Sequence, residues 1–65
     1  MQIILNGESR HCSAKTVSAL IDELGYADKR IAIELNGEIV PKSQHATTPL
    51  NEADQLEIVV AVGGG

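Results

Sequence analysis

Two short runs of β-prone residues are each followed by an Asn-Gly pair and a second β-prone run. Gln2 to Leu5 precedes Asn6-Gly7, and residues 31–35 precede Asn36-Gly37. Because Asn and Gly both tolerate φ > 0, Asn-Gly between two such runs is a strong short-range indication of a hairpin. The pattern predicts hairpins over residues 2–12 and 31–40, with Pro41 ending the second because it cannot donate to a strand ladder.

Between the two hairpins the apolar residues follow the spacing of an α-helix. They stand at i, i+3, i+4 and i+7 as Val17, Leu20, Ile21 and Leu24. Thr16 is a suitable N-cap, and Gly25 stands where a left-handed residue commonly ends a helix. A helix of about two to three turns is too short to be stable alone. Its apolar stripe is therefore expected to pack on a sheet.

Alternation returns near the end of the chain, over residues 56–62, after a polar, irregular segment at 42–49. The order of elements indicates an α+β fold: a mixed four- to five-stranded sheet with one main helix packed on one face. The first and last strands could then lie side by side and parallel in the centre of the sheet. The expected core is Ile3, Leu5, Val17, Leu20, Ile21, Leu24, Ile33, Leu35, Leu56 and Ile58.

Size and charge restrict the function. The chain has 65 residues, enough for one domain and too few for most self-contained enzymes with their own substrate pocket. Its net charge is −4, and Tyr26 is the single aromatic residue. Nucleic-acid binding requires a basic face and benefits from aromatic stacking, so this composition argues against it. An acidic domain of this size fits a protein partner with a basic rim.

Cysteine usage and the N-terminus indicate the compartment. Cys12 is the single cysteine, so no internal disulfide can form, which fits a reducing environment. The first residues lack the basic and apolar regions of a signal peptide, and no apolar stretch approaches the roughly 20 residues of a membrane span. We expect a cytoplasmic protein that is a monomer when free.

The side chains that usually carry chemistry show no convincing cluster. His11 and Cys12 are adjacent on an expected strand, so they point to opposite faces and cannot jointly bind a metal. His45 stands alone in a polar loop, and Cys12 is expected to be a half-buried structural thiol. We predict no metal site and no cofactor bound by the chain itself.

The chain ends in three glycines, Gly63, Gly64 and Gly65. They form either a frayed tail or a functional arm. An extended arm of three residues reaches roughly 10 Å and can enter a channel that any Cβ would block. Its terminal carboxylate is ionised at neutral pH and can attack an activated phosphorus.

The chain resembles the ubiquitin-like β-grasp family and, within it, the bacterial sulfur carriers of thiamine biosynthesis. The resemblance rests on residues 1–7, the helix from Thr16 to Leu24, residues 33–41, residues 50–58 and the terminal glycines. It implies a β-grasp domain over residues 1–62 and a flexible glycine tail over residues 63–65. The third glycine departs from the family's diglycine, and Ala53 replaces a glycine common among relatives, which stiffens that turn.

The resemblance also implies a chemistry for Gly65. A partner adenylyltransferase would use ATP and Mg²⁺ to adenylate the carboxylate. Sulfur from a cysteine desulfurase, carried as a persulfide, would displace AMP and leave a thiocarboxylate. Thiazole synthase would then take up that sulfur. The chain itself would be a protein co-substrate and not an enzyme.

Two alternatives stay open on the sequence. The chain could be the small subunit of molybdopterin synthase or a carrier for another sulfur-containing product. It could also be a β-grasp interaction module with an inert tail.

Strand alternation predicts where partners dock. Ile3, Leu5, Leu56 and Ile58 are assigned inward, so Ile4, Glu57, Val59 and Ala61 are expected on the opposite, helix-free face. With the first and last strands adjacent, Ile4 and Val59 are expected to be close neighbours. Ubiquitin-like proteins generally dock through this face, so the resemblance points the same way.

Overall fold

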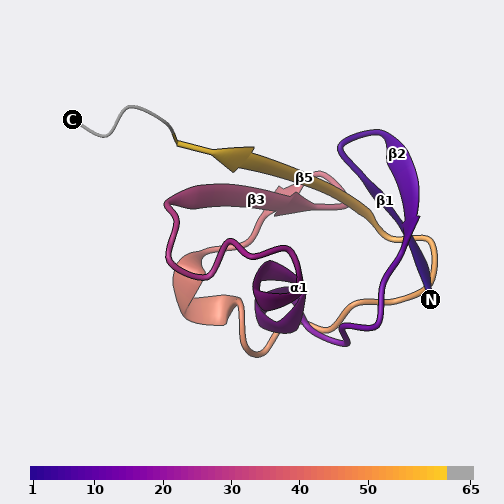
Figure 1. The fold of residues 1–65 in the computed structure, drawn as a ribbon, viewed down its shortest axis with the longest axis horizontal. Helices are drawn as coiled ribbons and strands as arrows, with labels where there is room; N and C mark the ends of the chain where they lie inside the picture. Colours follow the sequence, from indigo (N-terminus) through magenta and orange to yellow (C-terminus); the bar gives the residue numbers. More distant parts are fainter. Residues whose placement is uncertain (62–65) are drawn as a thin grey trace.

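The computed structural model describes residues 1–61, in which five strands form one mixed sheet with a helix packed against one face (Figure 1). The strand order is β2-β1-β5-β3-β4. Strands β1 and β5 are parallel, and the other neighbouring pairs are antiparallel. In chain order the elements are β1 (Gln2–Leu5), β2 (Glu8–His11), α1 (Val17–Glu23), β3 (Ile31–Leu35), β4 (Glu38–Ile39), the 3-10 helix η1 (Lys42–Gln44) and β5 (Gln55–Val60).

This arrangement confirms the predicted α+β fold and the parallel pairing of the first and last strands. Two predicted strands are shorter in the structure: β2 ends at His11 and not Cys12, and β4 ends at Ile39 and not Val40. The segment expected to be irregular contains η1. Val62, predicted in the last strand, lies outside the described residues.

The two Asn-Gly pairs form the predicted turns. Asn6 and Asn36 have φ values of 50° and 51°, and the glycines that follow have φ values of 83° and 88°. Positive φ at both central residues is the geometry of the type I′ hairpin turn, which matches the twist of the flanking strands.

The helix begins and ends as predicted. The Thr16 side chain accepts a hydrogen bond from the Ala19 amide, and Gly25 follows the C-cap residue Leu24 with a φ of 80°. The stripe of Val17, Leu20 and Ile21 is buried against the sheet.

The core largely contains the expected residues, with two differences. Leu5, Leu24 and Leu35 are half-buried at its border and not fully enclosed. Four further residues are buried that periodicity did not select: Cys12, Ala14, Val40 and Leu50. Cys12, expected to be half-buried, is fully enclosed, because the chain turns beneath the sheet as soon as β2 ends.

Candidate functional site at the root of the glycine tail

Strand β5 carries the chain from the centre of the sheet toward its C-terminal glycines (Figure 1). Its neighbours are β1 on one side and β3 on the other, and Ile31 and Ile33 lie opposite Val60 and Ile58. The pairing continues one residue past the strand, where the Ala61 amide donates to the Arg30 carbonyl at 2.9 Å. The backbone is therefore held in the sheet as far as Ala61. Gly63, Gly64 and Gly65, the predicted sulfur-bearing tail, lie outside the described residues.

The Asn6 side chain strengthens the hold on β5. Strand β1 ends at Leu5, and the backbone turns away at Asn6. The Asn6 Oδ1 accepts from the Ile58 amide at 2.8 Å, and its Nδ2 donates to the Ile58 carbonyl at 3.2 Å. The side chain thus takes the place of the next strand residue. Sequence reasoning identified Asn6 only as a turn residue and missed this role.

The predicted docking residues separate into two groups. Glu57, Val59 and Ala61 are exposed, and Val59 has 65% of its surface accessible. Ile4 is half-buried, and its Cα partner on β5 is Gln55. Val59 lies four residues farther along β5, which is about 13 Å at the usual rise of a strand. The prediction that Ile4 and Val59 are close neighbours is therefore wrong.

The register between β3 and β5 determines which residues do lie beside Val59. Ala32 is opposite Val59, and Glu34 is opposite Glu57. These residues and Ala61 are exposed, and the strand alternation that turns Ile33 and Ile58 toward the helix places them on the other face. We call this surface the outer patch: Ala32, Glu34, Glu57, Val59 and Ala61. It combines a small apolar area with two adjacent carboxylates at the root of the tail.

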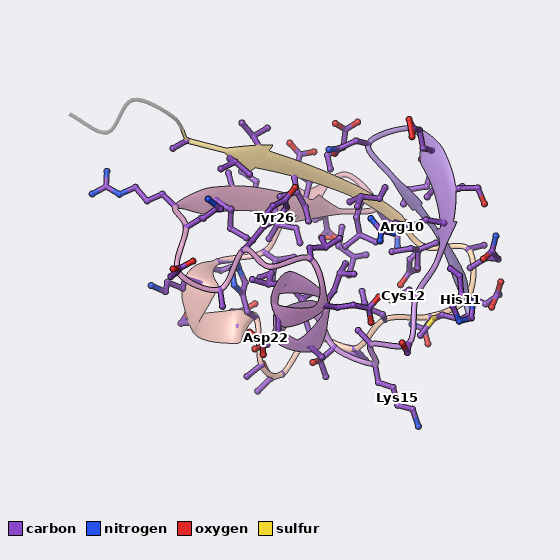
Figure 2. All side chains as sticks on the ribbon, viewed as in Figure 1. Arg10, His11, Cys12, Lys15, Asp22 and Tyr26 are labelled. Atoms are coloured by element: carbon purple, nitrogen blue, oxygen red, sulfur yellow. The ribbon has the colours of Figure 1, made fainter. Side chains whose placement is uncertain are left out.

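The remaining chemistry-bearing side chains are dispersed. His11 is exposed and Cys12 is buried, as the opposite-face prediction requires. Figure 2 shows both near the end of β2, well apart from Tyr26 and Asp22. His45 is half-buried, with its Nε2 3.1 Å from the Val40 carbonyl oxygen. Within residues 1–61 no three His, Cys, Asp or Glu side chains are grouped to hold a metal ion.

The single α-helix in the described part of the chain has seven residues, and no helix there is long and apolar enough to cross a membrane.

Comparison with known proteins identifies relatives of this chain in sequence and in structure. The ThiS family model matches residues 3–65. A thiazole synthase of Paramagnetospirillum magneticum is 50% identical over 66 aligned positions, which cover 100% of this chain and 20% of that protein. The sulfur carrier protein ThiS of Escherichia coli K12 is 32% identical, with 100% of both chains covered. The crystal structure of the thiamine biosynthesis protein ThiS from Geobacter metallireducens has a TM-score of 0.83 at 26% identity, again covering 100% of both chains.

A mixed five-stranded sheet with one covering helix, and a central last strand that leads to terminal glycines, defines a ubiquitin-like β-grasp protein. The family match is specific within that class: the chain belongs to the ThiS family. This confirms the resemblance predicted from the residues. The chain spans about a fifth of the length of the thiazole synthases it matches, from Paramagnetospirillum magneticum and Magnetococcus marinus.

Proposed function

We propose that this chain is the sulfur carrier of thiamine biosynthesis and that Gly65 bears the sulfur as a C-terminal thiocarboxylate. The main support is the match over the whole chain to sulfur carrier proteins named ThiS. The second support is position: the three terminal glycines follow a strand that the sheet holds as far as Ala61.

The reaction activates an unreactive carboxylate. A carboxylate oxygen of Gly65 attacks the α-phosphorus of ATP, held with Mg²⁺ by a partner adenylyltransferase, and pyrophosphate leaves. A persulfide supplied by a cysteine desulfurase then attacks the acyl carbon, and AMP leaves. A thiol cleaves the S–S bond of the resulting acyl disulfide and releases the thiocarboxylate. The chain provides neither acid nor base for these steps and acts as a protein co-substrate.

What the chain contributes is delivery of the carboxylate. Glycine lacks a Cβ, so the tail can enter a channel too narrow for any other residue. The partner enzyme aligns the reacting atoms and stabilises the developing charge. Because the sheet holds the backbone as far as Ala61, the tail starts from a defined position at the end of β5.

Thiazole synthase is the recipient that the comparisons favour. Two thiazole synthases contain a segment similar to this entire chain. A carrier and its acceptor enzyme joined in one polypeptide would face each other at high effective concentration, which fits a direct transfer of sulfur. A carrier for molybdopterin or another sulfur-containing product would form the same thiocarboxylate, and sulfur transfer to purified thiazole synthase distinguishes these pathways.

We assign docking of the adenylyltransferase to the outer patch. Val59 supplies exposed apolar surface, and Glu34 and Glu57 supply negative charge for a basic rim. Val59→Glu should weaken binding to the adenylyltransferase, because the apolar contact is replaced by a charge. Ser9→Glu is the matched control. Ser9 lies on the edge strand β2, where it pairs with Ile4 of β1, and β1 separates it from the outer patch on β5 and β3. Equal binding by the two variants would place the docking surface elsewhere.

Intact mass tests the tail chemistry. After incubation with ATP, the adenylyltransferase and a sulfur source, replacement of one oxygen by sulfur raises the mass by about 16 Da. Deletion of Gly65, or addition of one residue after it, should abolish this gain while thermal unfolding stays unchanged. Gly64→Ala should slow adenylation, because its Cβ must fit the channel. Normal thiocarboxylate formation by the extended chain would refute the assignment of Gly65.

A further inference from the structure

A groove opens at the edge of the sheet, beside the first half of β3. Strand β4 has two residues, Glu38 and Ile39, and Pro41 directs the chain away from the sheet. The Val40 amide makes the last hydrogen bond to β3, to the Ile33 carbonyl at 2.9 Å. The groove has a volume of about 490 Å³, within the usual range of binding sites, and is lined by residues from 21–33 and 39–45. We call it the edge groove.

The backbone of β3 presents an unpaired edge to this groove. The Arg30 carbonyl and the Asn36 amide both bond to β5, so the even-numbered residues of β3 direct their backbone groups toward β5. Ile31 and Ile33 therefore direct theirs to the other side. Within residues 1–61 the ladder between β3 and β4 pairs Glu34 with Ile39 and Leu35 with Glu38 and does not reach Ile31, and none of the backbone bonds outside the ladders involves Ile31. An unpaired strand edge is a template for an added extended segment.

Positive charge is concentrated around the same groove. The chain has five Lys and Arg residues, and Lys29, Arg30 and Lys42 line the groove. All three are exposed, and Asp28 is the one acidic residue among the lining residues described. In a protein of net charge −4, this is a local reversal of sign. It selects a negatively charged occupant.

Apolar surface accompanies the charge. Ile39 has 75% of its surface accessible and lines the groove, as does the half-buried Tyr26, the single aromatic residue. An occupant that covers Ile39 and meets the three cations must carry apolar and acidic side chains. Because strand side chains alternate between two faces, an extended peptide with alternating acidic and apolar residues meets both requirements.

We propose that the edge groove binds an extended acidic segment of a partner protein. The segment pairs with the backbone of Ile31, places carboxylates near Lys29, Arg30 and Lys42, and covers Ile39 with an apolar side chain. This groove adjoins the outer patch, because Ala32 belongs to both and Ile39 pairs with Glu34. Peptide binding in the groove requires no thiocarboxylate, so the proposal does not depend on the sulfur-carrier function.

The test uses the full chain, labelled with ¹⁵N, and a capped hexapeptide of alternating Glu and Val as the probe. The amide signals of residues 31–33 and of Ile39, Val40 and Lys42 should shift, and the Ile31 amide should become protected from hydrogen exchange. Lys29→Glu and Lys42→Glu should each weaken peptide binding by about three- to tenfold at low salt. Lys15→Glu is the matched control: Lys15 is exposed and lies outside the groove, so it should have little effect.

Four outcomes would overturn the proposal. No shift at residues 31–33 would mean that the cations and Pro41 only protect the edge from unwanted pairing. Equal weakening by Lys15→Glu would show general charge attraction. The same shifts with AMP or inorganic phosphate would indicate a small-anion site. Shifts that follow protein concentration without peptide would indicate a second copy of the chain. Thiocarboxylate formation without peptide is a separate measurement, so the two proposals fail independently.

Discussion

At the scale of single residues, the two Asn-Gly turns do more than reverse the chain. The Asn6 side chain holds Ile58 with two hydrogen bonds. The Asn36 side chain accepts from the Gln55 amide at 3.0 Å and donates to Asp54 Oδ1 at 3.1 Å. Both hairpins are thereby tied to β5 or to the turn that precedes it. Glycine would also adopt the positive φ at these positions, but it lacks the side-chain donor and acceptor that asparagine supplies.

Asn6→Gly should lower the free energy of unfolding by about 1–3 kcal/mol, because the Ile58 amide and carbonyl lose their partners. The glycine can keep the left-handed backbone, so the loss reports on the side-chain bonds. Urea unfolding measures it. Asn36→Gly is the comparison and should cost less, since its bonds are more exposed. Parent-like stability of Asn6→Gly would show that the bonds contribute nothing.

Ala53 has a φ of 68°, an unfavourable conformation for a residue with a Cβ. Its amide donates to the Gln2 carbonyl at 2.8 Å, so the turn cannot relax without losing a contact to β1. Ala53→Gly should raise the free energy of unfolding by about 0.5–1 kcal/mol. Ala46→Gly is the control. Ala46 is exposed with ordinary φ, so glycine there should destabilise. A loss of stability in Ala53→Gly would refute the strain argument.

At the scale of elements, the short helix depends on the segment that follows β4. The Val17 amide donates to the Thr48 carbonyl at 3.0 Å, and the Ser18 amide donates to the His45 carbonyl at 2.8 Å. With the Thr16 cap on Ala19, the first amides of α1 all have partners. The same segment continues to Leu50, whose side chain is buried in the core. The Leu50 amide donates to the Lys15 carbonyl, just before the helix.

Truncation of Leu20 or Leu56 to alanine should remove about 2–5 kcal/mol of stability, because both side chains are almost completely enclosed between α1 and the sheet. That is a large fraction of the stability of a small domain. Leu24→Ala is the matched comparison. Because Leu24 is half-buried, its truncation should lower the free energy of unfolding by less. Thermal unfolding measures all three. Nearly unchanged midpoints for Leu20→Ala and Leu56→Ala would mean that this packing is wrong.

At the scale of the whole molecule, charges of opposite sign gather on two adjoining surfaces. Glu34 and Glu57 lie opposite each other in the outer patch, and Lys29, Arg30 and Lys42 surround the edge groove. Like charges directly across a strand pair are destabilising. The cost in stability of this exposed carboxylate pair fits the docking role that we propose for the outer patch.

Glu34→Gln should therefore have two opposite effects. It should stabilise the fold by roughly 0.2–1 kcal/mol, because the repulsion with Glu57 is removed. It should also weaken binding to the adenylyltransferase and reduce the salt dependence of that binding. Glu8→Gln is the control, because Glu8 is exposed on the opposite edge strand β2. Stabilisation without any loss of affinity would separate the carboxylate pair from docking.

Local features of the sequence determined most of the elements. Asn-Gly pairs select type I′ turns through their backbone preferences, Thr16 and Gly25 terminate the helix, and apolar spacing identifies the buried face of α1. These effects act over a few residues and do not require the rest of the fold. The order of elements and the terminal glycines were then enough to indicate the family.

The tertiary structure alone decided how distant segments meet. The parallel register places Ile4 beside Gln55 and not beside Val59, because the Ile4 amide bonds to the Asp54 carbonyl at the turn before β5. The burial of Cys12 and Leu50 and the open edge of β3 likewise depend on where loops cross the sheet. Periodicity specifies which face a side chain occupies. It does not specify the offset between strands far apart in sequence, which depends on loop closure and the packing of the complete core.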